Sequence, residues 1–333
     1  MKNIKKLGLT ALAGSLVATS AYSADMAVTG SAELTYTTTS GTTKGGVDGN
    51  QWGFEKGIGW SASGEVMGYD VTLATTLSDA GSLSSSLLTF DLGDMGKIYF
   101  DAGNGATGIG TLENKGNVSA YEEADHGMTD MHQIDVNSAT QVMGYSSPAD
   151  MLLEGLDFSV EVIPSIGAQT TNSTAGSTSG AGSTGTEWNT AINYAIPMVD
   201  GLSLYFGYAS EDSSGTRDDD TEMTMGAEFA SGPVKIGYQH SEVEDATAAG
   251  DTVQAYGINF AVSDDLTISY SVTENTVEAI SATASTSSEA TGINAAYSIG
   301  GGSLRIFTGE QDNPGYVSGD KQEHTEISLS MSF

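Results

Sequence analysis

The chain of 333 residues carries 43 acidic and 11 basic side chains, which gives a formal net charge of −32 at neutral pH. This charge excludes nucleic acid as a partner, because binding to phosphates requires clustered bases. The chain has no cysteine, so a fold held by disulfides is excluded as well. Strongly acidic chains are often disordered, but 14 tyrosines, 9 phenylalanines and 3 tryptophans favour a folded protein.

Residues 1–24 are predicted to be a cleaved secretory signal peptide. Three lysines precede an apolar run at residues 7–18, and residues 21–23 form a cleavage site of the small-x-small type. The apolar run is too short for a membrane-spanning helix. We therefore expect export through the Sec pathway, and a single barrel domain over residues 25–333.

The mature chain is dominated by alternation of apolar and polar residues at period two, which is typical of strands with one dry and one wet face. The last strand shows the pattern most clearly, since Ile327, Leu329, Met331 and Phe333 share one face. Sixteen strands are predicted, at residues 27–38, 51–63, 68–78, 84–93, 96–102, 138–147, 155–163, 186–196, 201–210, 221–230, 233–241, 252–262, 266–274, 288–298, 303–310 and 323–333.

The connections between these strands alternate between long and short. A membrane barrel with external loops and periplasmic turns has this rhythm, whereas a soluble sandwich has no reason to adopt it. All five prolines fall in connections or at the first residue of a strand, where no ladder hydrogen bond is lost. The expected fold is all-β, a 16-stranded antiparallel transmembrane β-barrel.

Two local motifs carry a family resemblance. Residues 137–148 read NSATQVMGYSSP, and Asn137, Ser138, Tyr145, Ser147 and Pro148 carry the match. Residues 93–104 read GDMGKIYFDAGN and precede them. Both motifs resemble the segments that flank the constriction loop in the general porins of Gram-negative bacteria.

The resemblance implies a homotrimer of barrels in the bacterial outer membrane, each a water-filled channel for passive diffusion of small hydrophilic solutes and ions. It also implies that the third external loop, here residues 103–136, folds inward and narrows the pore. The partners would be outer-membrane lipid, lipopolysaccharide and the barrel-assembly machinery. Outer-membrane barrels commonly end on an aromatic residue, so Phe333 is the expected assembly signal.

Acidic side chains are predicted to set the ion preference of the pore. The candidate constriction residues, including the bases expected on the wall, are Glu113, Glu122, Glu123, Asp125, Asp130, Asp135, Lys97, Lys235 and Arg305. Acids concentrate cations and repel anions in a narrow passage, so cation selectivity is expected. Lys56 departs from the pattern on the dry face, which indicates either a subunit interface or a β-bulge.

No enzyme chemistry or cofactor is predicted. The four histidines show no spacing typical of metal ligands or a catalytic triad, and a metal contact of His126 with Asp125 or Asp130 is weighed only as a minor alternative. Acidic loops such as residues 211–222 could hold Ca²⁺ through carboxylate oxygens. The alternatives left open are an outer-membrane barrel with a structural or adhesive role and one with an enzymatic role.

Overall fold

The computed structural model describes residues 25–41, 50–77, 83–102, 107–128, 142–163, 186–211, 220–244, 250–277 and 286–333. Within these ranges the chain forms sixteen strands and four short 3₁₀ helices. The strands are β1 (Asp25–Gly41), β2 (Trp52–Val66), β3 (Tyr69–Leu77), β4 (Leu83–Asp91), β5 (Lys97–Asp101), β6 (Val142–Ser146), β7 (Leu156–Ile163), β8 (Glu187–Ala195), β9 (Leu202–Glu211), β10 (Asp220–Ser231), β11 (Val234–Glu244), β12 (Asp251–Ala261), β13 (Leu266–Val277), β14 (Thr286–Ser298), β15 (Gly302–Asp312) and β16 (Lys321–Ser332). The helices are η1 (Gly93–Met95), η2 (Gly108–Leu112), η3 (Lys115–Asn117) and η4 (Pro314–Tyr316). No helix in these ranges is long and apolar enough to cross a membrane.

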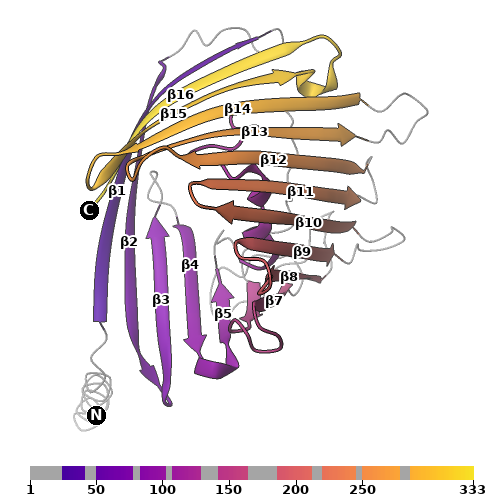
Figure 1. Cartoon of the computed structure of the whole chain (residues 1–333). Helices are drawn as coiled ribbons and strands as arrows, with labels where there is room; N and C mark the ends of the chain where they lie inside the picture. Colours follow the sequence, from indigo (N-terminus) through magenta and orange to yellow (C-terminus); the bar gives the residue numbers. More distant parts are fainter. Residues whose placement is uncertain are drawn as a thin grey trace, which may run out of the picture.

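Each strand pairs with its neighbours in the sequence, and β1 pairs with β16, so the sheet is a closed barrel (Figure 1). Every pairing between the described strands is antiparallel, as for β1 with β16 and for β8 with β9. Closure leaves no sheet edge with unpaired backbone groups, which is the condition for a β-structure in lipid. The predicted sixteen-stranded antiparallel barrel is therefore confirmed.

The two faces of the barrel wall differ in polarity. Large apolar side chains on the outer face are exposed, among them Phe54 and Ile236. The alternate residues face inward and are mostly small or polar, and Asn189, Gln239 and Asn294 are buried there. This distribution is the reverse of a soluble protein and fits a barrel with lipid outside and water inside.

Lys56 lies on the outer face, opposite Ala32 of the neighbouring strand. The ladder between β1 and β2 runs without a register shift from Asp25 and Ser63 to Tyr36 and Trp52. The β-bulge considered for Lys56 is therefore wrong, and its ammonium group lies 5.8 Å from the ring centroid of Phe54. A subunit interface at Lys56 stays a prediction.

The first and last strands close the barrel at the C-terminal residue. Phe333 donates its backbone N–H to Gly30 at 2.9 Å and accepts the N–H of Gly30 at 2.7 Å. A Cβ on Gly30 would stand 2.5 Å from Cε2 of the Phe333 ring. The glycine therefore leaves room for the terminal ring to lie across the closing seam.

Candidate functional site

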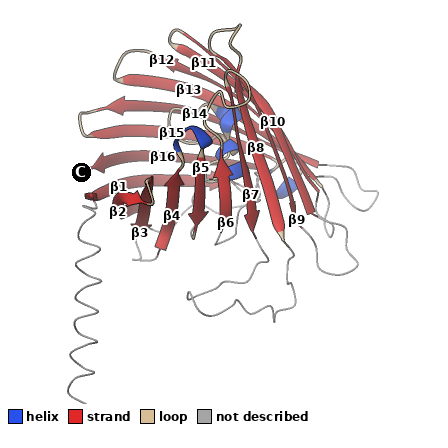
Figure 2. Ribbon diagram, turned by 90° about the horizontal axis from the view of Figure 1, so that it is seen from below, coloured by secondary structure: helices blue, strands red, loops and turns tan. Residues whose placement is uncertain are grey.

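Segment 107–128 follows β5 and lies against the inner face of the barrel. Its helices η2 and η3 contact strands from β7 to β13, and Figure 2 draws short helices in blue within the ring of strands. Four backbone amides of the segment donate to polar side chains of the wall. The pairs are Ile109 to Asn189 (3.1 Å), Gly116 to Gln239 (2.9 Å), Ala120 to Ser269 (2.8 Å) and Glu122 to Asn294 (3.1 Å).

Glycines of the wall allow the segment to approach the strands closely. We call Gly207, Gly237, Gly257, Gly292 and Gly309 the glycine row. A Cβ on Gly237 would stand 2.7 Å from the carbonyl oxygen of Gly116, and one on Gly207 would stand 2.7 Å from Cγ1 of Ile109. A Cβ on Gly257 would overlap the carbonyl group of Asn117. Larger side chains at these positions would push the segment away from the wall.

Apolar contacts hold the first part of the segment. Ile109 and Leu112 are completely buried, the first against Ala209 and the second against Ala191 and Tyr205. These are among the few large apolar side chains inside a wall of polar residues. Hydrophobic burial and the hydrogen bonds of the backbone amides therefore fix the same stretch of chain.

Tyr121 and Arg305 hold the second part of the segment near the closing seam. The guanidinium group of Arg305 lies 4.2 Å from the ring centroid of Tyr121 and 2.6 Å from a carboxylate oxygen of Glu33. The hydroxyl of Tyr121 donates to Glu33 at 3.0 Å and also contacts Glu326. Since Glu33 belongs to β1 and Glu326 to β16, Tyr121 bridges the two strands that close the barrel.

Lys115 is the base that the segment itself contributes. Its ammonium group donates to Oδ1 of Asn193 at 2.6 Å and lies 5.0 Å from the ring centroid of Tyr205. Burial lowers the pKa of Lys115, although Glu228 and Asp157 act in the opposite direction. The lysine thus stands among wall residues of β7 to β10.

The predicted acids of the segment lie in different environments. Glu113 is exposed, Glu122 and Glu123 are half-buried, and Asp125 is buried. Burial raises the pKa of the Glu122 and Glu123 carboxyl groups above their ordinary values. Asp130 and Asp135 fall within residues 129–141, all of which lie outside the described residues.

The predicted wall bases all face inward, and each has an acidic partner. Lys97 lies 3.5 Å from Asp91, and Lys235 lies 2.5 Å from Glu228. Arg305 pairs with Glu33, as described above. Because each base has a nearby acid, the positive charge of the wall is locally compensated.

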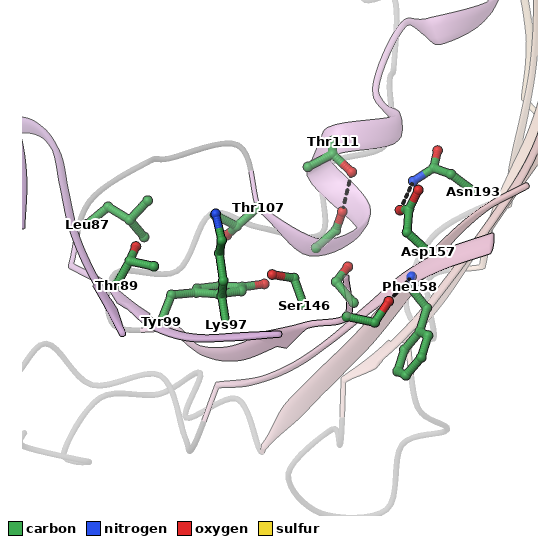
Figure 3. A pocket seen from close by; sticks show the side chains of 13 residues that line it. Leu87, Thr89, Lys97, Tyr99, Thr107, Thr111, Ser146, Asp157, Phe158 and Asn193 are labelled. Carbon is green, nitrogen blue, oxygen red and sulfur yellow. Dashed lines mark hydrogen bonds between the residues drawn. The ribbon is translucent and has the colours of Figure 1, made fainter. Parts of the chain in front are cut away.

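A pocket of about 430 Å³ opens between the start of the segment and strands β4 to β8. Figure 3 shows Lys97 and Tyr99 on one side of it and Asp157 beside Asn193 on the other. The amide of Asn193 donates to Asp157 at 3.0 Å, and Thr111 lines the pocket from the segment. A positive group, a negative group and neutral polar groups therefore all face this space.

The sequence did not single out the wall residues that bind the segment. Asn189, Gln239 and Asn294 appear as ordinary polar positions of alternating strands. One feature of the sequence could have indicated them: Asn and Gln stand on the inward face at positions where Ser or Thr would suffice. A carboxamide can donate and accept hydrogen bonds at once, which suits it to bind a backbone. Gln239 uses both capacities, since its amide nitrogen also donates to the carbonyl oxygen of Leu112 at 3.1 Å.

Solved structures of porins share the closed-barrel fold of this chain. A porin structure aligns with a TM-score of 0.64 and 14% sequence identity, covering 93% of this chain and 100% of its own. OmpF of Salmonella typhi in complex with daunomycin aligns with a TM-score of 0.65 and 12% identity, covering 92% and 97%. The anion-selective porin from Comamonas acidovorans aligns with a TM-score of 0.63 and 11% identity, covering 93% and 100%. The resemblance to porins is thus confirmed for the fold.

Comparison with protein-family models found no match, and comparison with curated proteins found none either. The likeness to solved structures includes an anion-selective porin. The fold alone therefore does not decide which ions or solutes are preferred.

Proposed function

We propose that the protein is a porin of the bacterial outer membrane, a water-filled channel for passive diffusion of small hydrophilic solutes and ions. The observation that carries this proposal is the closed barrel with an apolar outer face, a polar inner face and a segment bound along one side of the interior. A barrel of sixteen strands is wide enough to leave an aqueous channel. Export by the predicted signal peptide, whose residues 1–24 lie outside the described ranges, agrees with this location.

Segment 107–128 is proposed to be an inward-folded third external loop that narrows the pore. Its hydrogen bonds run along the inner face from β8 to β16 and reach Glu33 of β1. The middle of the inner face of β2 carries small residues instead, such as Gly57, Gly59 and Ser61. The aqueous passage would then lie between the segment and the wall formed by β2 to β5.

Cation preference is proposed from the charges around this passage. Glu55, Asp70 and Asp91 lie on the inner face of β2 to β4, and Glu122 and Glu123 lie on the segment. The wall bases Lys97, Lys235 and Arg305 each have an acid within 3.5 Å. Excess acid in a confined passage of low dielectric attracts cations and excludes anions.

We also propose that the protein forms a homotrimer. It would contact lipopolysaccharide and be inserted by the barrel-assembly machinery. The outer face supports it, because it presents apolar side chains such as Trp52 and Ile58 together with the mid-strand Lys56. A charged side chain on such a face is better accommodated between subunits than in lipid.

The experiment is reconstitution of the mature protein into planar bilayers. We expect discrete conductance steps and a zero-current potential in a salt gradient whose sign indicates cation preference. The variant Glu122→Gln/Glu123→Gln should shift that potential toward zero. The matched variant Asp264→Asn/Asp265→Asn, in the short turn between β12 and β13, should leave it unchanged. Absence of conductance would overturn the channel and favour a structural, adhesive or enzymatic barrel, and an anion-selective wild type would overturn the charge assignment.

A further inference from the structure

Two histidines that are far apart in the sequence meet inside the barrel. His126 belongs to segment 107–128, while His324 and Glu326 belong to β16. One nitrogen of each ring and one oxygen of the carboxylate lie within 4.8 Å of one another. The distance from Nε2 of His126 to Oε2 of Glu326 is 3.6 Å.

The second nitrogen of each ring is held by a different residue. Nδ1 of His126 lies 3.1 Å from a carboxylate oxygen of Glu122, and Nδ1 of His324 lies 2.9 Å from the hydroxyl of Thr39. Metal-binding histidines are usually oriented in this way by a hydrogen bond to the nitrogen that does not bind the metal. Nε2 is therefore the nitrogen that each histidine would offer.

Packing fixes both rings before any ion arrives. The buried Phe307 meets the ring of His126 edge-on at 5.6 Å and lies 6.0 Å from that of His324. Gly127 has φ +70°, and a Cβ there would stand 2.6 Å from Cε1 of His324. The carbonyl oxygen of the same glycine accepts a hydrogen bond of 2.8 Å from Gln322. Preorganised ligands of this kind bind a metal without the cost of ordering them.

We propose that His126, His324 and Glu326 form a binding site for a first-row transition ion such as Zn²⁺. Zinc takes imidazole nitrogen and carboxylate oxygen at about 2.0–2.2 Å, which in a tetrahedron separates the ligand atoms by roughly 3.4 Å. The separation of 3.6 Å between His126 and Glu326 is near that value, and the ligand atoms of all three residues lie within 4.8 Å of one another. His126 is only half-buried, so the fourth position of such an ion would be accessible to water.

The donor set also selects against other ions. Ca²⁺ and Mg²⁺ prefer cages of oxygen atoms, whereas two imidazole nitrogens favour zinc and its neighbours in the first transition row. Such an ion would tie segment 107–128 to β16, the strand that closes the barrel. The site therefore differs from the oxygen-ligated Ca²⁺ sites considered for the acidic loops.

The test uses the full mature protein, folded in detergent, stripped with a chelator and titrated with Zn²⁺ by calorimetry and with Co²⁺ by visible absorption at about pH 8, where imidazole is neutral. We expect uptake of one ion per chain and the visible bands of tetrahedral Co²⁺. The variant His126→Ala should bind at least about tenfold more weakly and lose these bands. The control His240→Ala, whose ring contacts Glu242 at 3.1 Å, should bind as the wild type does.

Heat-modifiable migration on gels verifies that each variant is folded. His126 lies outside the strands, so its variant decides the question even where His324→Ala fails to assemble. Equal uptake by the wild type and folded His126→Ala would overturn the site. Displacement of the bound ion by Ca²⁺ at equal concentration would overturn it as well, because it would indicate binding by carboxylates alone. Neither readout depends on conductance, so failure of the channel proposal leaves this test intact.

Discussion

The carbonyl group of Asn117 lies where the Cβ of any other residue at position 257 would stand. Asn117 is buried and belongs to η3, and Gly257 belongs to β12. The backbone of segment 107–128 thus touches the backbone of the wall with no side chain between them. The position of the segment across the interior depends on this contact.

The variant Gly257→Ala should push the segment away from the wall and into the passage. A backbone group cannot rotate away as a side chain does, so we expect lower single-channel conductance and a stability loss of about 1–3 kcal/mol from overpacking. The control is Gly64→Ala in β2, where no atom lies within 4 Å of the added Cβ. Wild-type conductance in correctly folded Gly257→Ala would contradict the constriction assigned to this segment.

Cation preference should weaken in mildly acidic solution. Burial raises the pKa values of Glu122 and Glu123, so these carboxylates gain protons at a higher pH than exposed glutamates, which titrate near pH 4.3. Their negative charge is present above the raised pKa values and is lost as the pH falls through them. When the pH is lowered from about 8 to about 4, the zero-current potential of the wild type should therefore begin to fall at a pH above that at which exposed glutamates titrate. In Glu122→Gln/Glu123→Gln the early part of this decline should be missing.

Replacement of Arg305 by glutamine should strengthen cation preference. Arg305 is the base nearest Glu33, at 2.6 Å, and its removal leaves that carboxylate uncompensated beside the passage. Lys321→Gln is the matched control, since Lys321 contacts Glu310 at 2.6 Å and Asp312 at 2.8 Å with exposed side chains on both sides. Reversal potentials at low and high salt separate the two, because screening by salt reduces the effect of exposed charges more. An equal shift in both variants would count against a special role for Arg305.

Deletion of Phe333 should impair assembly in cells more than it weakens the finished barrel. The deletion removes two backbone hydrogen bonds with Gly30, each worth about 1 kcal/mol, from a sheet that remains paired elsewhere. Surface levels in cells, compared with the urea midpoint of protein refolded in detergent, distinguish assembly from stability. Normal surface levels would show that the terminal ring is not the recognised signal.

The fold could be predicted because alternation at period two depends only on neighbours in the sequence. Ile327 and Leu329 specify an outer face whatever strand lies beside them, and the same holds for the other fifteen strands. The bulge considered for Lys56 was wrong. The ladder between β1 and β2 is regular, so the charged side chain lies on the outer face without any change of register.

The site was harder to predict because it depends on the path of one segment across the interior. His126 and His324 share no local pattern, and only the course of residues 107–128 along the wall brings them together. The sequence shows only the charge of the segment acids, whereas their burial differs in the fold: Glu113 is exposed and Asp125 is buried. Glycine also occurs in turns and β-bulges, so the sequence does not reveal that the glycine row accommodates a second backbone.

The bridge formed by Tyr121 has a consequence for how the barrel is completed. Its hydroxyl contacts Glu33 on the first strand and Glu326 on the last, so one side chain of the interior spans the seam. Separation of β1 from β16 costs these contacts as well as the ladder between the strands. The seam is fully stabilised only when the segment is in place, so closure of the wall and binding of the segment to it are energetically coupled.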